Sequence, residues 1–188
     1  PAEAGGSVFV RAIVAEDGQL VTKSRQITLD ASAGAIEPDP ARDTLLIAVV
    51  NRYAPAPVAT AFIQGIGLSR GAIASSVAHD CHNVVAVGAS REELAAAVNA
   101  VFAARGGLAV ADGASIEVLR LPIAGLMSDL PAEVVAERYA ALSAKARSLG
   151  SPLRAPFMTL SFMALLVIPE LKLGDRGLFD GLRFEFTH

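Results

Sequence analysis

The first ninety residues alternate between short apolar runs and clusters of glycine, proline and acidic residues, a pattern that predicts strands joined by turns. Thr44 to Asn51 is a continuous apolar run of strand length, which indicates a central strand buried on both faces. Further short runs predict strands at Ser7 to Val14, Leu20 to Leu29, Val58 to Gln64, Ala72 to Ala78 and Val84 to Val87. This half of the chain is therefore expected to form most of a sheet.

Helical spacing of apolar residues first occurs at Ser90 to Arg105. Ser90 is a favoured N-cap, and Glu93 stands three residues later at the capping-box position. Gly106-Gly107 then provides a stop signal. The segment is therefore expected to form a capped helix.

A second helix is predicted from about Pro131 to Leu149, with Asp129 as its N-cap and Gly150 at its end. Between the helices, Asp112-Gly113 is typical of a tight hairpin, and a last strand is expected near Leu182 to Phe186. Short turns between neighbouring strands, together with two clear helices, predict an α+β fold. We expect a largely antiparallel sheet with two main helices packed on it.

Gly34, Pro38 and Pro40 make the segment from Ala31 to Arg42 a predicted linker or long loop. It separates a strand and turn segment, residues 1–43, from a main domain, residues 44–188. The first thirty residues are expected to pair either with the main sheet or with a neighbouring domain. Pro1 fits two interpretations, a chain that lost its initiator methionine and a piece of a longer protein.

Composition narrows the class of protein. Sixteen basic and nineteen acidic residues give a formal net charge of −3, which offers no electrostatic footprint for nucleic acid or anionic lipid. The longest apolar stretch, Phe157 to Pro169, is interrupted by Thr159 and Ser161 and is shorter than the roughly 18 residues of a membrane span. Cys81 is the only cysteine, which fits a reducing compartment. We therefore expect a cytoplasmic protein without a membrane or nucleic-acid partner.

The densest group of polar residues lies between two predicted strands and contains two of the three histidines. The candidate substrate-facing residues in it are Ser76, His79, Asp80, His82 and Asn83. The histidines have the chemistry to bind a metal, transfer a proton or donate hydrogen bonds to a polar substrate. The segment equally fits a hairpin tip whose side chains satisfy backbone groups. A metal site at His79 and His82 finds no support in their spacing, which matches no established zinc pattern.

Other features indicate structural roles. Gly65 to Gly71 resembles a phosphate-binding loop, but no helix follows it, so a turn between two strands is predicted. Ser75 and Ser76 lack the strand–turn–helix setting of a hydrolase nucleophile. Glu170 and Lys172 are expected to form a solvated ion pair. The three methionines are expected in the core: Met127, Met158 and Met163.

Four stretches of the sequence, taken together and in order, carry a resemblance to a known family. They read GIGLSRGAIASSVAHDCHN from Gly65, LPIAGLMSD from Leu121, PFMTLSF from Pro156 and IPELKL from Ile168, followed by Asp175 and Gly177. In this order they resemble the carboxy-terminal domain of the adenine deaminases, members of the amidohydrolase superfamily. The resemblance extends from about Leu45 to Asp180, and residues 1–43 add little to it.

The resemblance implies a hydrolase that converts adenine and water to hypoxanthine and ammonia. It also implies a barrel, in cis or in trans, in which a divalent cation, iron or manganese, activates the attacking water. Three histidines, one of them His188, are too few for such a centre. We therefore expect this domain to support the barrel, to hold no cofactor of its own and to be inactive alone. The segment from His79 to Asn83 is expected to face the active-site mouth and to help enclose the purine.

Three residues depart from the family pattern, in which arginine-histidine, serine and proline are usual. They are Tyr53 in Arg52-Tyr53, Cys81 and Leu166. If the usual histidine touches the substrate or the metal, Tyr53 changes the activity. Two other interpretations stay open. The chain is a free-standing, non-catalytic domain for purine binding or for assembly, including homo-oligomers, or it is an independent metalloenzyme that uses His79, Asp80 and His82.

Overall fold

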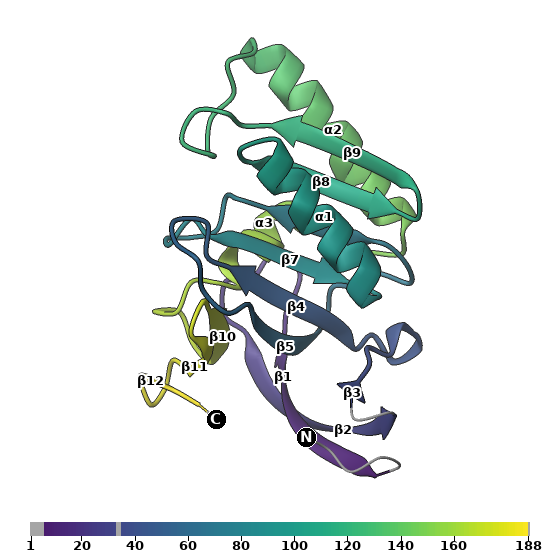
Figure 1. Ribbon diagram of the computed structural model, residues 1–188. Helices are drawn as coiled ribbons and strands as arrows, with labels where there is room; N and C mark the ends of the chain where they lie inside the picture. Colours follow the sequence, from purple (N-terminus) through teal and green to yellow (C-terminus); the bar gives the residue numbers. More distant parts are fainter. Residues whose placement is uncertain (1–5, 33–34, 188) are drawn as a thin grey trace.

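The computed structural model describes residues 6–32 and 35–187, and its centre is a nine-stranded sheet (Figure 1). The strands are β1 (Ser7–Val14), β2 (Lys23–Ser32), β3 (Ala35–Ile36), β4 (Leu45–Val50), β5 (Ala59–Gln64), β6 (Ala72–Ser75), β7 (Val84–Gly88), β8 (Gly107–Asp112) and β9 (Ser115–Arg120). Their spatial order is β3-β2-β1-β5-β4-β7-β6-β8-β9. All neighbours are antiparallel except β1 and β5, which run parallel.

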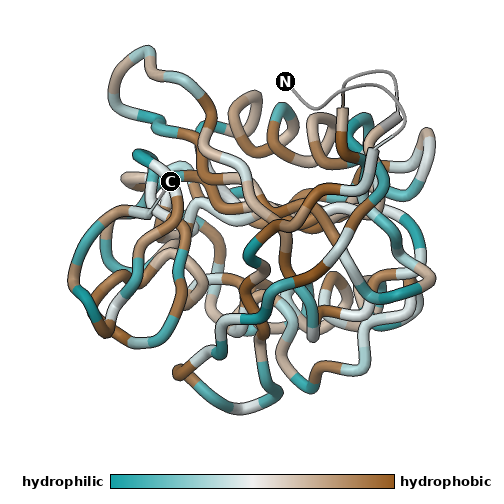
Figure 2. Tube along the Cα trace, turned by 90° about the horizontal axis from the view of Figure 1, so that it is seen from below, coloured by the Kyte–Doolittle hydropathy of each residue, from teal (hydrophilic) through white to brown (hydrophobic). Residues whose placement is uncertain are grey.

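The other elements cover this sheet. They are η1 (Pro40–Arg42), α1 (Arg91–Ala103), α2 (Ala132–Ser148), α3 (Pro156–Phe162), and the strands β10 (Leu171–Gly174), β11 (Gly177–Asp180) and β12 (Glu185–Phe186), which form a second, antiparallel sheet. Helix α1 packs on β6, β7 and β8 on one face, while α2, α3 and the second sheet pack on the other face (Figures 1 and 2). None of the helices formed by residues 6–32 and 35–187 is long and apolar enough to cross a membrane.

Strand β4 shows why the central apolar run is continuous. Leu45, Ile47 and Val49 point into the core below the α2 and α3 layer, whereas Leu46 and Ala48 point into the core below α1. A strand with a hydrophobic core on each side has no polar face, so the period-2 alternation disappears. The prediction of a central strand buried on both faces is confirmed.

The predicted α+β class and the largely antiparallel sheet are confirmed, as are two local features. The Ser90 hydroxyl accepts a hydrogen bond from the Glu93 amide at 3.2 Å, so Ser90 is the N-cap of α1 as predicted. The Glu93 carboxylate does not complete the capping box: it accepts hydrogen bonds from the Ser90 hydroxyl and from the Gly71 and Gly113 amides. The hairpin at Asp112-Gly113 joins β8 to β9. Gly65 to Gly71 is a turn between β5 and β6, and Asp43 holds it by accepting hydrogen bonds from the Gly65 and Gly67 amides at 2.6 and 2.8 Å.

Several expectations about elements were wrong. The structure has a third helix, α3, which lacks an amphipathic pattern because it is buried on nearly every side. Asp129 does not cap α2: Pro131 occupies the N-cap position, and no side chain makes a cap hydrogen bond there. The predicted loop from Ala31 to Arg42 contains the end of β2, β3 and η1. Pro1, Gly34 and His188 lie outside the described residues.

The two strands near the amino terminus, β1 and β2, pair within this chain. Strands β1 and β2 form a hairpin over eight residue pairs, and β1 pairs with β5 at Ala12–Val14. The Thr22 hydroxyl also donates a hydrogen bond to the Leu171 carbonyl at 2.8 Å, which ties this hairpin to β10. The division at residue 43 stays a prediction.

Lys172 and Glu170 do not form the expected solvated ion pair. Lys172 is fully buried, and its Nζ donates a hydrogen bond to the Leu20 carbonyl at 2.6 Å. The Glu170 carboxylate instead accepts a hydrogen bond from the Ser24 amide at 3.0 Å. Burial lowers the pKa of Lys172 from 10.5 to about 8.

Lys172 should make the stability of the domain depend on pH. Between about pH 8 and 10.5 the folded lysine is neutral while the unfolded lysine is still protonated, so the unfolded state binds more protons and stability rises with pH. The full rise is about 3 kcal/mol. Urea denaturation across this range should show it for the native sequence, and Lys172→Met should remove it. Parallel pH profiles for the two proteins would contradict the assignment.

Gly65 should be intolerant of any side chain. Its φ is +90°, and an added Cβ would lie 1.9 Å from the Ala15 carbonyl oxygen. We expect Gly65→Ala to destabilise the fold by about 3 kcal/mol or more, because both the backbone conformation and the contact oppose it. Gly113→Ala is the matched control, since Gly113 also has positive φ, +60°, but open space around it. That variant should cost only about 1–2 kcal/mol in the same denaturation experiment.

Candidate functional site

Three loops that are distant in sequence meet at one end of the sheet, and Arg52 connects them. They follow β4, join β6 to β7, and join β9 to α2. The Arg52 Nε donates a hydrogen bond to the His82 carbonyl, and its Nη2 donates one to the Ala124 carbonyl at 2.6 Å. His82 and Ala124 both have positive φ, 52° and 56°, a conformation that is uncommon outside glycine. Arg52 therefore holds two unusual loop conformations at this end.

Tyr53, one of the three residues that depart from the expected family pattern, also lies at this end. Its side chain is largely exposed, its hydroxyl donates a hydrogen bond to the His82 carbonyl at 3.3 Å, and the Arg52 guanidinium stacks over its ring at 4.8 Å. Asn51, two residues earlier, donates from Nδ2 to the Asp175 carboxylate at 2.9 Å. The loop after β4 is thereby joined both to the histidine segment and to the turn between β10 and β11.

The structure places the predicted site residues in two groups. His79 and His82 are half-buried and Asp80 is exposed, so these three lie at the surface of the loop between β6 and β7. Ser76 and Asn83 are buried. The Ser76 hydroxyl donates to the Gly125 carbonyl at 2.6 Å, and the Asn83 Oδ1 accepts from the Arg52 amide at 3.4 Å. In this structure Ser76 and Asn83 make hydrogen bonds to backbone groups of neighbouring loops. His79, Asp80 and His82 lie at the surface, where a ligand is able to reach them.

His79 is oriented by α3. Its imidazole stacks on Phe162 with ring centroids 4.6 Å apart, and its backbone amide donates to the Ser161 carbonyl at 2.9 Å. The ring lines an apolar hollow of about 240 Å³ between the sheet, α2 and α3, together with Tyr139 and Met158. His79 therefore presents a polar ring at the edge of an otherwise apolar hollow. Hydrogen bonding or proton transfer to a bound ring is within its chemistry.

The segment does not fit a metal centre or an activated thiol. Within residues 6–32 and 35–187, no three His, Cys, Asp or Glu side chains are grouped closely enough to hold a metal ion. His79, Asp80 and His82 therefore do not form the donor set that an independent metalloenzyme needs. Desolvation raises the pKa of the Cys81 thiol, although the residue as a whole is exposed, so the thiol form predominates at neutral pH.

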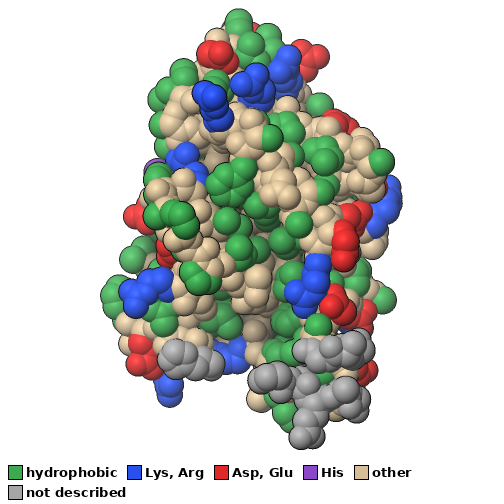
Figure 3. Space-filling model, in the orientation of Figure 1, with side chains coloured by type: hydrophobic (Ala, Val, Ile, Leu, Met, Phe, Trp, Pro, Cys, Tyr) green, Lys and Arg blue, Asp and Glu red, His purple; other side chains and the backbone are tan. Residues whose placement is uncertain are grey.

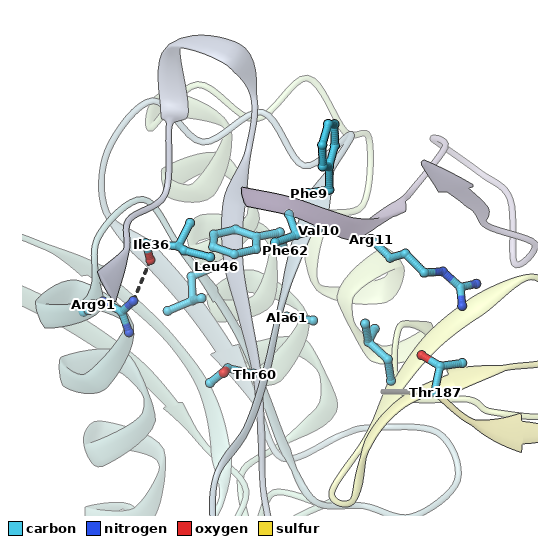
Figure 4. A pocket seen from close by; sticks show the side chains of 11 residues that line it. Phe9, Val10, Arg11, Ile36, Leu46, Thr60, Ala61, Phe62, Arg91 and Thr187 are labelled. Atoms are coloured by element: carbon cyan, nitrogen blue, oxygen red, sulfur yellow. Dashed lines mark hydrogen bonds between the residues drawn. The ribbon is translucent and has the colours of Figure 1, made fainter. Parts of the chain in front are cut away.

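A larger cleft of about 520 Å³ lies elsewhere, between β1 and β5 (Figure 4). The two strands pair at Ala12–Val14 but diverge before it, so Phe9 and Val10 line the cleft opposite Thr60 and Ala61. Its two arginines are already paired: Arg11 with Asp180 at 3.0 Å, and Arg91 with Glu37 at 3.0 Å. We therefore take the loop end as the candidate site. The face that carries α1 has its charged side chains mainly towards the margins (Figure 3).

Sequence reasoning found the histidine segment because its residues are contiguous. It missed the role of Arg52, whose acceptors lie 30 and 72 residues away along the chain. The stretch LPIAGLMSD was recognised, but no local pattern shows that its Ala124 carbonyl faces Arg52. Pairs of this kind become visible only in the folded chain.

The chain is similar to known proteins along nearly its whole length. The family model "Adenine deaminase C-terminal domain" matches residues 19–185, beginning well before the expected start at Leu45. Relatives named adenine deaminase include those of Salinibacter ruber, 58% identical over 98% of this chain, and Methanosarcina barkeri, 52% identical over 95%. That of Parabacteroides distasonis is 46% identical over 95% of the chain. The chain spans 34%, 32% and 33% of these relatives, about a third of their length. It belongs to the adenine deaminase C-terminal domain family.

Proposed function

We propose that this chain is the carboxy-terminal domain of an adenine deaminase that converts adenine and water to hypoxanthine and ammonia. The observation that carries the proposal is sequence similarity to proteins named adenine deaminase. The identity is 52% and 58% in two of them, over nearly the whole chain. A metal-bearing amidohydrolase barrel, outside this chain, completes the enzyme. The single cysteine fits a reducing compartment, and we place the enzyme in the cytoplasm.

The iron or manganese that the resemblance implies belongs to the barrel. The described residues offer no donor set that fits it, so this chain is assigned binding and positioning roles only. Support for this division comes from the site itself. The loop backbone is fixed by hydrogen bonds from or to Arg52, Ser76 and Asn83. His79 and His82 instead lie at the loop surface. Such an arrangement fixes a loop in one conformation, as a wall of a binding site requires.

In the proposed enzyme the loop from His79 to Asn83 faces the active-site mouth. The purine ring carries nitrogen acceptors and an exocyclic amine, which imidazoles and a carboxylate are able to bind. His79, His82 and Asp80 are the candidates for these contacts. Stacking of His79 on Phe162 restricts its ring, which lowers the entropy cost of orienting a substrate.

The double variant His79→Ala/His82→Ala, made in the full-length enzyme, tests this role. We expect KM for adenine to rise about thirtyfold, because two hydrogen bonds are lost and each contributes roughly 1 kcal/mol. Steady-state kinetics would measure it, with Glu117→Ala on the exposed surface of β9 as the control. Unchanged kinetics in the double variant would contradict the placement of this loop at the active-site mouth.

The isolated chain separates the proposal from the alternative of a free-standing purine-binding or assembly domain. We expect no ammonia release from adenine by the chain alone, and no heat of adenine binding in calorimetry, because the barrel is missing. The same titration with the full-length enzyme should show saturable binding and turnover. Adenine binding by the chain alone would favour the alternative instead.

A further inference from the structure

Two methionines expected in the core are exposed. Met163 is fully buried, as predicted, but Met158 is 50% exposed and Met127 is 58% exposed. Met158 lies on α3, a helix without a charged residue, whose other side chains are mostly buried against the sheet. A single exposed apolar side chain needs no explanation, so what matters is whether Met158 belongs to a larger apolar surface.

Met158 forms a ridge between two hollows. The first is the apolar hollow of about 240 Å³ that His79, Leu126 and Tyr139 also line. The second, about 220 Å³, lies between α3 and the turn after β1, where Leu20 and Phe162 line it. We call these residues the α3 surface: Leu20, His79, Leu126, Tyr139, Met158 and Phe162. A partner protein is able to pack against this ridge and place its own side chains in the two hollows.

Helix α2 leaves the first hollow open. Its buried residues, Leu142, Ser143 and Ala146, all lie in its second half. Val135 and Tyr139, in the first half, are only half-buried, although they point to the same side. The second half of the helix is thus the more deeply packed one. In the first half, the Tyr139 ring still reaches Phe157 of α3, with ring centroids 6.2 Å apart.

We propose that the metal-bearing portion of the enzyme docks on the α3 surface, with apolar side chains filling the hollows on either side of Met158. This inference rests on the proposed function. About two thirds of the relatives' length lies outside this chain, so a partner of that size needs a contact surface here. Methionine is suited to such a contact because its flexible, polarizable side chain adapts to a partner's shape.

Continuity with the histidine loop favours this occupant over a second copy of the chain. His79 belongs both to that loop and to the α3 surface, through its stack on Phe162. A body seated on α3 therefore meets the loop that the proposed function places at the active-site mouth. A symmetric dimer through α3 would cover this loop with another copy that brings no metal donor set from its described residues.

The test measures thiol accessibility in the full-length enzyme. Met158→Cys is compared with Ile116→Cys, since the two native side chains are similarly exposed in this chain, 50% and 45%. Ile116 lies on β9 two residues before Val118, which packs in the core on the α1 side. Because side chains alternate along a strand, Ile116 lies on that same face, opposite α3. Maleimide labelling is followed at each site by peptide mass spectrometry. We expect the cysteine at 158 to react at least about tenfold more slowly than that at 116, and equally fast in urea.

Equal rates in the native enzyme would overturn the inference. Protection that disappears on dilution would also overturn it, because it would identify the occupant as a second copy. Deaminase activity of the native full-length enzyme, measured beside the two variants, tests the proposed function separately. An active enzyme with a reactive cysteine at 158 rejects only the docking surface, whereas protection in an inactive enzyme rejects only the proposed function.

Discussion

Burial of the central strands on both faces is the constraint from which the rest of the structure follows. Strands β4 and β7 alternate between two hydrophobic cores, so neither face of the sheet centre is able to meet water. One face takes α1 and the other takes α2, α3 and the second sheet. Polar groups are then confined to strand ends and loops, which is why the candidate site lies at one end of the sheet.

This constraint also decides what the sequence was able to predict. Apolar runs such as Thr44 to Asn51 identify buried strands, and Ser90 with Glu93 identifies the start of α1, because both signals are local. Helix α3 escaped prediction because burial on nearly every side removes the polar stripe that marks a helix. Lys172 was misjudged for a related reason: its partner is a carbonyl 152 residues away.

The candidate site divides in the same way. His79 to Asn83 was predicted as a unit because polar residues crowd into one short segment. The geometry that gives the segment its shape is long-range: Arg52 reaches the His82 and Ala124 carbonyls, and Ser76 reaches Gly125. The sequence thus locates the loop. Only the fold shows which of its residues lie at the surface and which make hydrogen bonds to backbone groups.

Contacts between the amino-terminal hairpin and the carboxy-terminal elements connect this loop to the packing of the whole domain. Thr22 and Lys172 join the first hairpin to β10, and Asp17 pairs with Arg154 just before α3 at 2.7 Å. Helix α3 is thereby fixed from the amino-terminal side, while Phe162 and Ser161 fix His79 from the other. The same short helix that carries the exposed ridge thus sets the position of the histidine. Recognition of a partner on α3 and orientation of the loop are, in this fold, two consequences of one packing arrangement.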